Sequence, residues 1–246
     1  MRLIVFIAAL FTSLIVMGSA EQVVVRLNTQ TYTFENQVRL SSILSLIADK
    51  GDWHWPSAAI FDLNDPTAEN EQKAILTEIE RIKSDVKLGT PDKEALDNLY
   101  AQVSAWTVAT RLSVPVSYNR ARLYFEDNPM FEYGHYWVRL NTRPNVVHFS
   151  GIIEKPGAYK HASNLSITSV VGVVSKSTDA DRSFVYVISP QGKVSEKGIA
   201  YWNFDFSQVA PGSQIFIPAS ANLFDSRIQK LNERISALAV HRVLPQ

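Results

Sequence analysis

Two stretches of this chain carry the same order of secondary-structure signals, and this weak repeat constrains the fold more than any other feature of the sequence. Each stretch opens with a β-branched or aromatic run typical of a strand, Val23–Val25 in the first and Val146–Phe149 in the second. A polar turn and a second short strand follow, and then apolar residues at helical spacing, over Leu40–Ile47 and Leu165–Val174. We therefore expect two units that each join a strand pair to a helix.

Both units close in the same way, on a polar turn with glycine and a final apolar strand. These last strands are Gly134–Val138 and Gly212–Ile217. Strand pair, helix, strand, turn, strand is the order of a β-grasp fold. The sequence therefore predicts an α+β protein with two tandem β-grasp domains, over residues 21–144 and 145–219.

The first unit is interrupted at about residues 66–110 by an insertion with the pattern of two helices. The apolar residues of the first helix share one face, at Ile75, Ile79, Ile82 and Val86. Asp65–Pro66 marks its start and Gly89 its end. Thr90–Pro91 is typical of the start of the second helix, whose apolar stripe is Leu96, Leu99, Val103 and Trp106. We expect an antiparallel helical hairpin packed on the sheet.

A terminal amphipathic helix is predicted within residues 220–246. Its apolar residues recur every three or four positions, at Phe224, Ile228, Leu231, Ile235 and Leu238. Two interpretations remain open for this stripe. It packs on its own domain, as most helices of this length do, or it docks on a partner or on a membrane surface, the outer membrane included.

The N-terminus has the three parts of a secretory signal peptide. Arg2 gives the positive charge, Leu3–Met17 the apolar core, and Gly18–Ala20 the small residues before cleavage at Glu21. The apolar run is shorter than the ~20 residues that a membrane span needs. We therefore expect residues 1–20 to be removed and the protein to be periplasmic. With no cysteine in the chain, no disulfide stiffens it, so its stability has to come from burial.

Charge and motif content exclude several classes of function. The chain has 24 basic and 24 acidic residues, a balance that argues against a nucleic-acid partner. None of its five histidines lies in a nucleophile motif, and the sequence has no thiol and no spacing typical of zinc ligands. The sequence therefore predicts no metal and no cofactor, and it offers no catalytic triad.

Pairs of acidic residues keep one enzymatic alternative open. A glycosidase needs only two carboxyl groups about 5 to 10 Å apart, which a sequence cannot reveal. The pairs that stand out are Glu126 with Asp127 and Asp179 with Asp181. Because both lie beside turn signals, where solvated acids are common, we favour a binding role over catalysis.

Two aromatic clusters are candidate sugar-binding surfaces. They are Trp53–Pro56, which contains Trp55, and the pair Tyr201 and Trp202. Aromatic rings stack on the apolar faces of sugars, but they also fill protein cores. Both interpretations are kept for each cluster.

The run Val147–Tyr159 resembles the opening of a soluble-ligand-binding β-grasp domain, with a strand, a glycine, then Pro-Gly and an aromatic residue. Further motifs follow in register at Ala180–Ser183, Pro190–Gly192, Ala200–Asn203 and Pro211–Gly212. Upstream, four more lie in the matching order, at Trp55–Ala58, Thr110–Arg111, Asn128–Pro129 and Arg143–Pro144. Together these motifs resemble the GfcC/YjbG-like capsule and exopolysaccharide biosynthesis family over nearly the whole mature chain.

The resemblance implies a periplasmic protein with two β-grasp domains, a hairpin inserted in the first, and a C-terminal amphipathic helix. It also implies similarity to the periplasmic domains of outer-membrane polysaccharide exporters, whose terminal helix enters the membrane within an oligomeric pore. Arg111 lies where the family has an arginine, although Ala109–Thr110 replaces the Thr-Gly that precedes it in the family. This guanidinium is expected either to bind a carboxylate or phosphate of a glycan precursor or to bond strand and loop carbonyls.

The function expected from these features is that of a non-enzymatic periplasmic accessory protein for assembly or export of a capsule or exopolysaccharide. Its partners would be the polysaccharide or the export machinery. The alternatives are an enzyme that modifies the polymer through an acidic pair, and an oligomer that associates with the outer membrane through the terminal helix.

Overall fold

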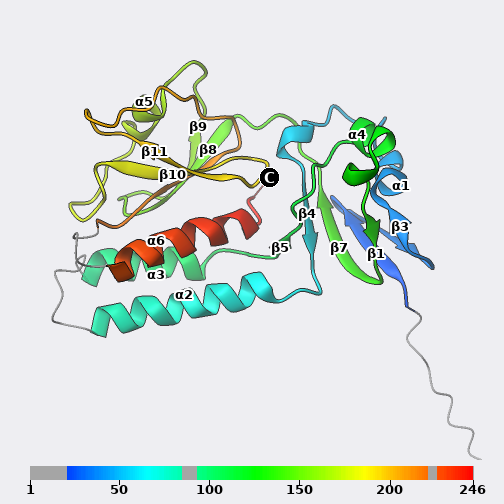
Figure 1. Ribbon diagram of the computed structural model, residues 1–246, viewed down its shortest axis with the longest axis horizontal. Helices are drawn as coiled ribbons and strands as arrows, with labels where there is room; N and C mark the ends of the chain where they lie inside the picture. The colour runs from blue at the N-terminus through cyan, green and yellow to red at the C-terminus, as the bar shows by residue number, and fades with distance from the viewer. Residues whose placement is uncertain (1–20, 85–92, 221–225, 246) are drawn as a thin grey trace, which may run out of the picture.

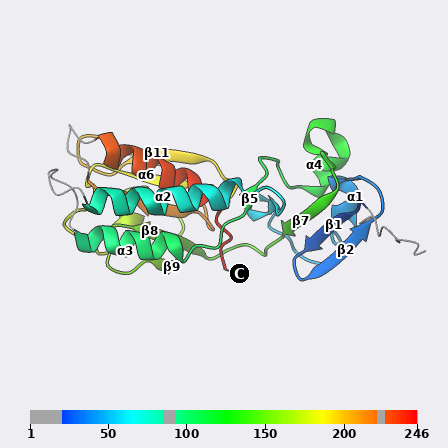
Figure 2. The same ribbon diagram turned by 90° about the horizontal axis from the view of Figure 1, so that it is seen from below.

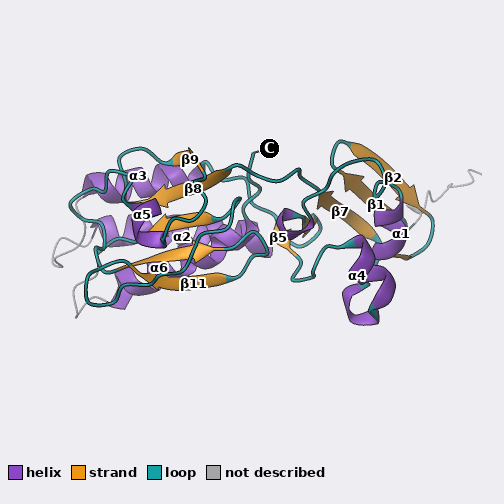
Figure 3. Cartoon of the chain, turned by 90° about the horizontal axis from the view of Figure 1, so that it is seen from above, coloured by secondary structure: helices purple, strands orange, loops and turns teal. Residues whose placement is uncertain are grey.

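Two five-stranded sheets lie at opposite ends of the protein, with three long helices beneath the second of them (Figures 1 and 3). The structure, a computed structural model, describes residues 21–84, 93–220 and 226–245. The first sheet has the strand order β2-β1-β7-β4-β5. Its strands in chain order are β1 (Val23–Leu27), β2 (Gln30–Phe34), β4 (Ala59–Asp62), β5 (Thr110–Arg111) and β7 (Gly134–Arg139).

The second sheet repeats the order of the first. Its order is β9-β8-β12-β10-β11, so that in both sheets the sequence of strands across the sheet is second, first, fifth, third, fourth. The first and last strands of each set are parallel central neighbours, β1 with β7 and β8 with β12. These strands are β8 (Val146–Gly151), β9 (Gly157–Lys160), β10 (Phe184–Ile188), β11 (Val194–Gly198) and β12 (Gln214–Ile217).

The α+β class and the repeated strand order predicted from the sequence are confirmed. The strand pairs expected at Val23 and at Val146 form antiparallel hairpins. The short helix expected in each unit is also present, as α1 (Leu40–Ser45) and α5 (Ile167–Val171). Both are shorter than the apolar spacing indicated. The division of the chain into domains at residues 144 and 219 stays a prediction.

Alternation of side chains explains why the first sheet forms where it does. Val23, Val25 and Leu27 are buried on one face of β1, while Arg26 points to solvent. This period of two is what a strand with one covered face requires. The buried face packs on the apolar residues of α1, which begins at Leu40. Two short strands, β3 (Val38–Arg39) and β6 (Met130–Phe131), and the helix α4 (Tyr118–Leu123) complete this end.

The inserted hairpin consists of α2 (Thr67–Ser84) and α3 (Lys93–Ser104). Asp65 marks the start of α2 as expected, because its Oδ1 accepts the backbone N–H of Thr67 at 2.9 Å. The predicted stop at Gly89, the start at Thr90–Pro91 and the apolar Val86 lie outside the described residues.

The hairpin leaves the first sheet between β4 and β5 but packs on the second sheet. Ile75, Ile79 and Leu99 belong to one buried core with Phe149 of β8 and Ile215 of β12. Our expectation that the hairpin packs on the sheet that it interrupts is therefore wrong. Helical periodicity identifies the face that must be buried, but it carries no information on which sheet buries it.

A polar clamp fixes α3 to the end of β8. The side chain of Gln102 donates to the carbonyl of Gly151 and accepts from its N–H, both at 2.9 Å. Gly151 has a φ of +99°, and a Cβ there would lie 2.0 Å from the carbonyl oxygen of Ile217. Only glycine therefore fits where β8, β12 and α3 meet.

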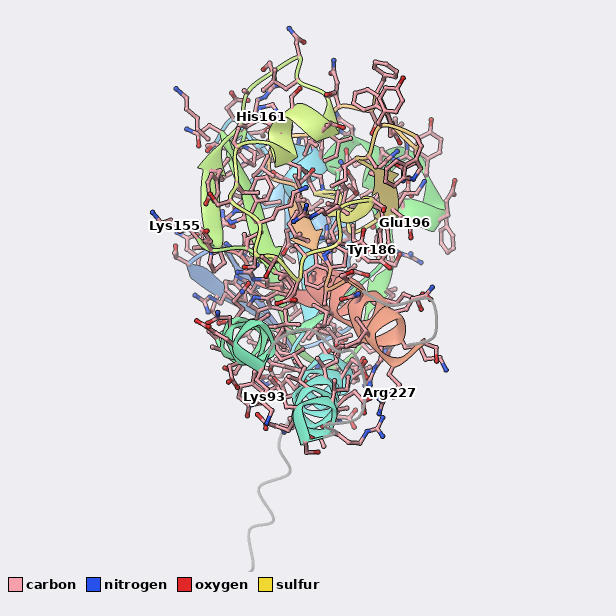
Figure 4. The ribbon with its side chains drawn as sticks, turned by 90° about the vertical axis from the view of Figure 1, so that its left-hand side faces the viewer. Lys93, Lys155, His161, Tyr186, Glu196 and Arg227 are labelled. Atoms are coloured by element: carbon pink, nitrogen blue, oxygen red, sulfur yellow. The ribbon has the colours of Figure 1, made fainter. Side chains whose placement is uncertain are left out.

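The terminal helix α6 (Ser226–Leu238) lies beside α2 in the same core. Figure 2 shows the three helices together from below, and Figure 4 looks along them, with Lys93 near the start of α3 and Arg227 near the start of α6. Arg234 of α6 pairs with Glu71 of α2 at 2.7 Å. The side chain of Asn232 accepts the N–H of Ala219 at 3.0 Å and donates to the carbonyl of Ala219 at 2.8 Å.

The apolar stripe of α6 is buried by the chain itself, as the first of its two interpretations predicts. The buried members are Ile228, Leu231, Ile235 and Leu238, whereas Phe224 lies outside the described residues. In this conformation the four side chains do not face a partner or a lipid surface. Within the described ranges, none of the helices combines the length and the apolar composition that crossing a bilayer requires.

The chain then turns back toward the first sheet. After the 3₁₀ turn Ala239–His241, residues 242–245 run between the two sheets (Figure 1). The N–H of Ala109 donates to the carbonyl of His241 at 3.0 Å, and the N–H of Val243 donates to the carbonyl of Thr107 at 2.8 Å. In addition to the linker between β7 and β8, the two sheets are therefore joined by the hairpin and by this C-terminal segment.

We predict that Ile79→Ala lowers the free energy of unfolding by about 2 to 4 kcal/mol, because it leaves a cavity between α2 and the second core. Lys73→Ala, an exposed change on the same helix, should stay within about 0.5 kcal/mol of wild type. Urea denaturation measures both. Amide exchange in Ile79→Ala should accelerate in α6 and β12 more than in β1, and the reverse order would contradict the packing of the hairpin on the second sheet.

Candidate functional site

A cavity of about 530 Å³ lies where the two sheets and the C-terminal segment meet. The first sheet contributes β4, β5 and the end of β7, and the second contributes β8, β12 and the turn after β10. The linker 140–146 and the last residues, Leu244 and Pro245, close the sides. Its volume is in the range of cavities that hold small molecules.

All the charged side chains that line this cavity in the described structure are positive. Four arginines and one histidine line it, whereas none of the described lining residues is Asp or Glu. The five cationic or titratable residues are Arg111, Arg139, Arg143, Arg242 and His148. Arg139, Arg143 and His148 come from the continuous stretch of β7, the linker and β8, whereas Arg111 of β5 and Arg242 of the C-terminal segment are far from it in the sequence. We call this group the arginine cavity.

Arg139 is the most buried of the four, with 7% of its surface exposed. Its Nη1 donates to the carbonyl of Leu244 at 2.5 Å, and its guanidinium lies 5.1 Å from the ring centre of Trp137. The Nε is buried and has no hydrogen-bond partner among the described residues. Burial lowers the pKa of Arg139, and the neighbouring charge of Arg26 lowers it further.

Arg242 also lines the cavity and has a similar environment. Its guanidinium lies 4.7 Å from the ring centre of Trp106, an arrangement that gives a cation–π attraction but no counter-ion. Its Nη1 is buried and finds no partner in the described part of the chain. Burial lowers the pKa of Arg242 to about 10.

Arg111 connects the two sheets. Its Nη2 donates to the carbonyl of Pro190, in the turn between β10 and β11, at 2.6 Å. Its backbone N–H donates to Nδ1 of His241 at 2.9 Å. Burial lowers the pKa of its guanidinium to about 10. Of the two roles expected for Arg111, the structure displays the bond to a loop carbonyl, and contact with an anion stays a proposal.

His148 is buried on β8 beside the arginines, with 7% of its surface exposed. Burial, together with the positive charge of Arg242, lowers its pKa to about 4. His241 is shifted in the same direction, by burial and by Arg111. Both imidazoles are therefore neutral at pH 7 and add no charge to the cavity.

Trp55 lies outside the arginine cavity. It belongs to the 3₁₀ turn Trp55–Ser57 and lines a second hollow of about 430 Å³, which Arg111 and Gln191 also line. Arg111 thus borders both hollows. Trp53, which belongs to the same aromatic cluster as Trp55, does line the arginine cavity.

Tyr201 and Trp202 are not part of this site. They follow β11 in a loop of the second unit and are 98% and 76% exposed. Neither of them lines the two hollows beside Arg111. The four residues that the sequence offered as ligand-binding candidates therefore do not form one site.

One member of each acidic pair of the enzymatic alternative is engaged in local structure. Asp127 is buried and pairs with Arg120 at 2.5 Å. The Oδ1 of Asp181 accepts the backbone N–H groups of Ser183 and Phe184, at 2.7 and 3.2 Å. These contacts give both carboxylates a structural role.

Sequence analysis did not identify Arg139, Arg242 or His148 as site residues. Arg139 is the last residue of a mainly apolar strand, a position that gives no sign of a binding role. Arg242 follows a helix with several charged residues, and its own charge does not stand out from theirs in the sequence. Arg143 was named only as part of the Arg143–Pro144 motif and not as a site residue. Only the approach of the C-terminal segment to β7 brings these residues together.

Comparison with known proteins finds two matched family regions, which contain the four arginines of the site but not His148. Residues 19–143 match the family described as "Capsule biosynthesis GfcC, N-terminal", and residues 155–244 match "Capsule biosynthesis GfcC C-terminal". The chain is also similar to "Uncharacterized protein YjbG" of Escherichia coli (strain K12), with 26% identity over 190 residues, 77% of this chain and 76% of that protein. Arg111, Arg139 and Arg143 fall in the first region and Arg242 in the second.

We predict a pH-dependent loss of stability that depends on His148. In the unfolded chain His148 takes up a proton below its ordinary pKa of 6.5, whereas in the folded protein it does so only near pH 4. Because the unfolded state then binds more protons, the free energy of unfolding falls between pH 6.5 and 4, by on the order of 3 kcal/mol.

His148→Gln should reduce this fall, and part of it should remain because the pKa of His241 is also lowered. His135→Gln, an exposed change on β7, serves as the control and should leave the slope unchanged. Denaturant titrations at pH 7, 6, 5 and 4 give the slopes. Equal slopes for His148→Gln and wild type would refute the assignment to His148.

Proposed function

Because the chain belongs to the GfcC capsule biosynthesis family, we propose that it is a non-enzymatic periplasmic accessory protein in the assembly or export of a capsule or exopolysaccharide. Its partner is the polysaccharide itself, or the export machinery that carries it. The signal-peptide pattern of residues 1–20 supports the periplasmic location.

The arginine cavity is the observation that most supports a binding role. Hydrolysis of a glycosidic bond ordinarily takes two carboxyl groups on either side of the bond. The described lining offers arginines instead, and its one buried imidazole has a pKa of about 4. Such groups hold and orient an oxygen-rich ligand but are poorly matched to proton transfer near pH 7.

We also propose that both sheets are β-grasp domains in tandem. Their shared strand order, with the first and last strands parallel at the centre, supports this assignment. The short helix between the strand pair and the third strand lies where that fold has its helix. In this proposal the insertion of α2 and α3 is the feature that sets the first domain apart from the second.

We predict that deletion of the gene abolishes or strongly reduces surface polysaccharide, and that wild-type protein supplied in trans restores it. Staining of the cell surface and quantification of released polymer measure this. Fractionation of the complemented cells should place the protein in the periplasm.

Incubation of purified protein with the isolated polymer distinguishes the enzymatic alternative. The proposal predicts an unchanged chain length by size-exclusion chromatography. Shortening of the polymer, lost on an acid-to-amide substitution at Asp179 or Asp181, would contradict a non-enzymatic role. Unchanged surface polysaccharide in the deletion strain would contradict the role in capsule or exopolysaccharide production.

A further inference from the structure

We propose that the arginine cavity binds an acidic sugar, with Arg139 and Arg242 holding its oxyanion, a carboxylate or a phosphate. This inference rests on the proposed role in polysaccharide handling and gives that role a ligand class and a site. It concerns Arg139 and Arg242, and it gives Arg111 the separate role of bonding to the second sheet through the carbonyl of Pro190.

The first argument is the missing counter-charge. Some arginines elsewhere in the described chain are paired with carboxylates, as in Arg234 with Glu71 and Arg120 with Asp127. Arg139 and Arg242 have no described carboxylate within 4.0 Å, although both are largely withdrawn from water. A buried charge without a partner is costly, so an anionic ligand is the group that this arrangement lacks.

The second argument is the supply of unused donors. The Nε of Arg139 and the Nη1 of Arg242 are buried, line the same cavity and have no described hydrogen-bond partner. Guanidinium donors in a fixed plane suit the paired oxygens of a carboxylate or phosphate. Arg143, exposed in the linker, adds a third cation at the edge of the cavity, where it attracts an incoming anion.

The third argument distinguishes a sugar from a free anion. Gln214 lines the cavity with 5% of its surface exposed, and its Nε2 donates to the carbonyl of Ala239 at 2.7 Å. Its Oε1 is buried and has no hydrogen-bond partner among the described residues, so it can accept a hydrogen bond from a sugar hydroxyl. Asn145 and the indole of Trp53 also line the cavity, and they provide further polar contact and an apolar surface for a sugar ring.

A consequence for the unliganded protein separates this role from a structural one. If Arg242 is held for a ligand, then Arg242→Met removes an uncompensated charge and keeps the packing on Trp106. The melting temperature of the free protein should therefore stay the same or rise. A structural arginine would instead show a clear fall.

The test uses the full mature protein and titration calorimetry with an oligosaccharide of six sugars that contains glucuronate. The matched ligand is the same oligosaccharide with its carboxyl groups reduced to alcohols. We expect binding of the acidic form that weakens with added salt, and affinity at least tenfold lower for the reduced form, because one charged hydrogen bond contributes roughly that factor. Glucose 1-phosphate and inorganic phosphate are titrated in parallel.

Two protein variants distinguish binding in the cavity from nonspecific attraction of the acidic ligand to positive charge on the protein surface. Arg242→Met should lower affinity for the acidic ligand roughly 10- to 100-fold. Arg122→Met, at an exposed arginine of α4 outside the cavity, should leave affinity unchanged. Binding of glucose 1-phosphate in place of the glucuronate ligand would support the site and identify phosphate as the oxyanion.

Three results would overturn the inference. The first is equal affinity for the acidic and reduced oligosaccharides together with no binding of glucose 1-phosphate. The second is inorganic phosphate that binds as tightly as glucose 1-phosphate, and the third is full affinity for the acidic ligand in Arg242→Met. If one of them occurs while gene deletion still removes surface polysaccharide, the ligand assignment fails and the proposed accessory function stands. If deletion has no effect but the acidic sugar binds, the proposed function fails alone.

Discussion

The architecture depends on one apolar core that joins elements from both halves of the chain. The hairpin α2–α3 starts in the first sheet, α6 comes from the end of the chain, and both bury their stripes on the second sheet. Ile79 and Ile235 are fully buried in this core. At roughly 1.5 to 3 kcal/mol for each such side chain, the shared core is a substantial part of what folds the protein without disulfides. Its position also determines where the two sheets meet.

Function follows from that meeting point because every wall of the arginine cavity comes from a different segment. Arg139 belongs to the first sheet, His148 to the second, and Arg242 to the segment that follows α6. None of these residues forms a site by itself. These residues meet at one cavity only because the hairpin and the C-terminal segment hold the sheets in place, despite the cost of burying the two guanidinium charges. Such an arrangement favours affinity for an anion over maximal stability.

The sequence predicted local structure well and long-range contacts poorly. The alternation at Val23, Val25 and Leu27 and the helical spacing of Ile75, Ile79 and Ile82 are properties of neighbouring residues, and each element was found where it was expected. The prediction of which sheet the hairpin packs on was wrong, because a stripe of isoleucines can pack on either sheet. Arg111 was identified through the resemblance to the family, whereas Arg139 and Arg242 become neighbours only in the folded chain, 103 positions apart in sequence.

The central claim is that the shared core holds the two sheets in one fixed relation. Because the chain has no native cysteine, spin labels can be attached at Thr31→Cys on β2 and at the exposed Lys155→Cys beside β9. Pulsed electron–electron double resonance then measures the distance between the two labels. A single narrow distance distribution in the otherwise unaltered protein is the predicted result. A broad distribution, or two separate distances, would show that the sheets move independently and would contradict the account.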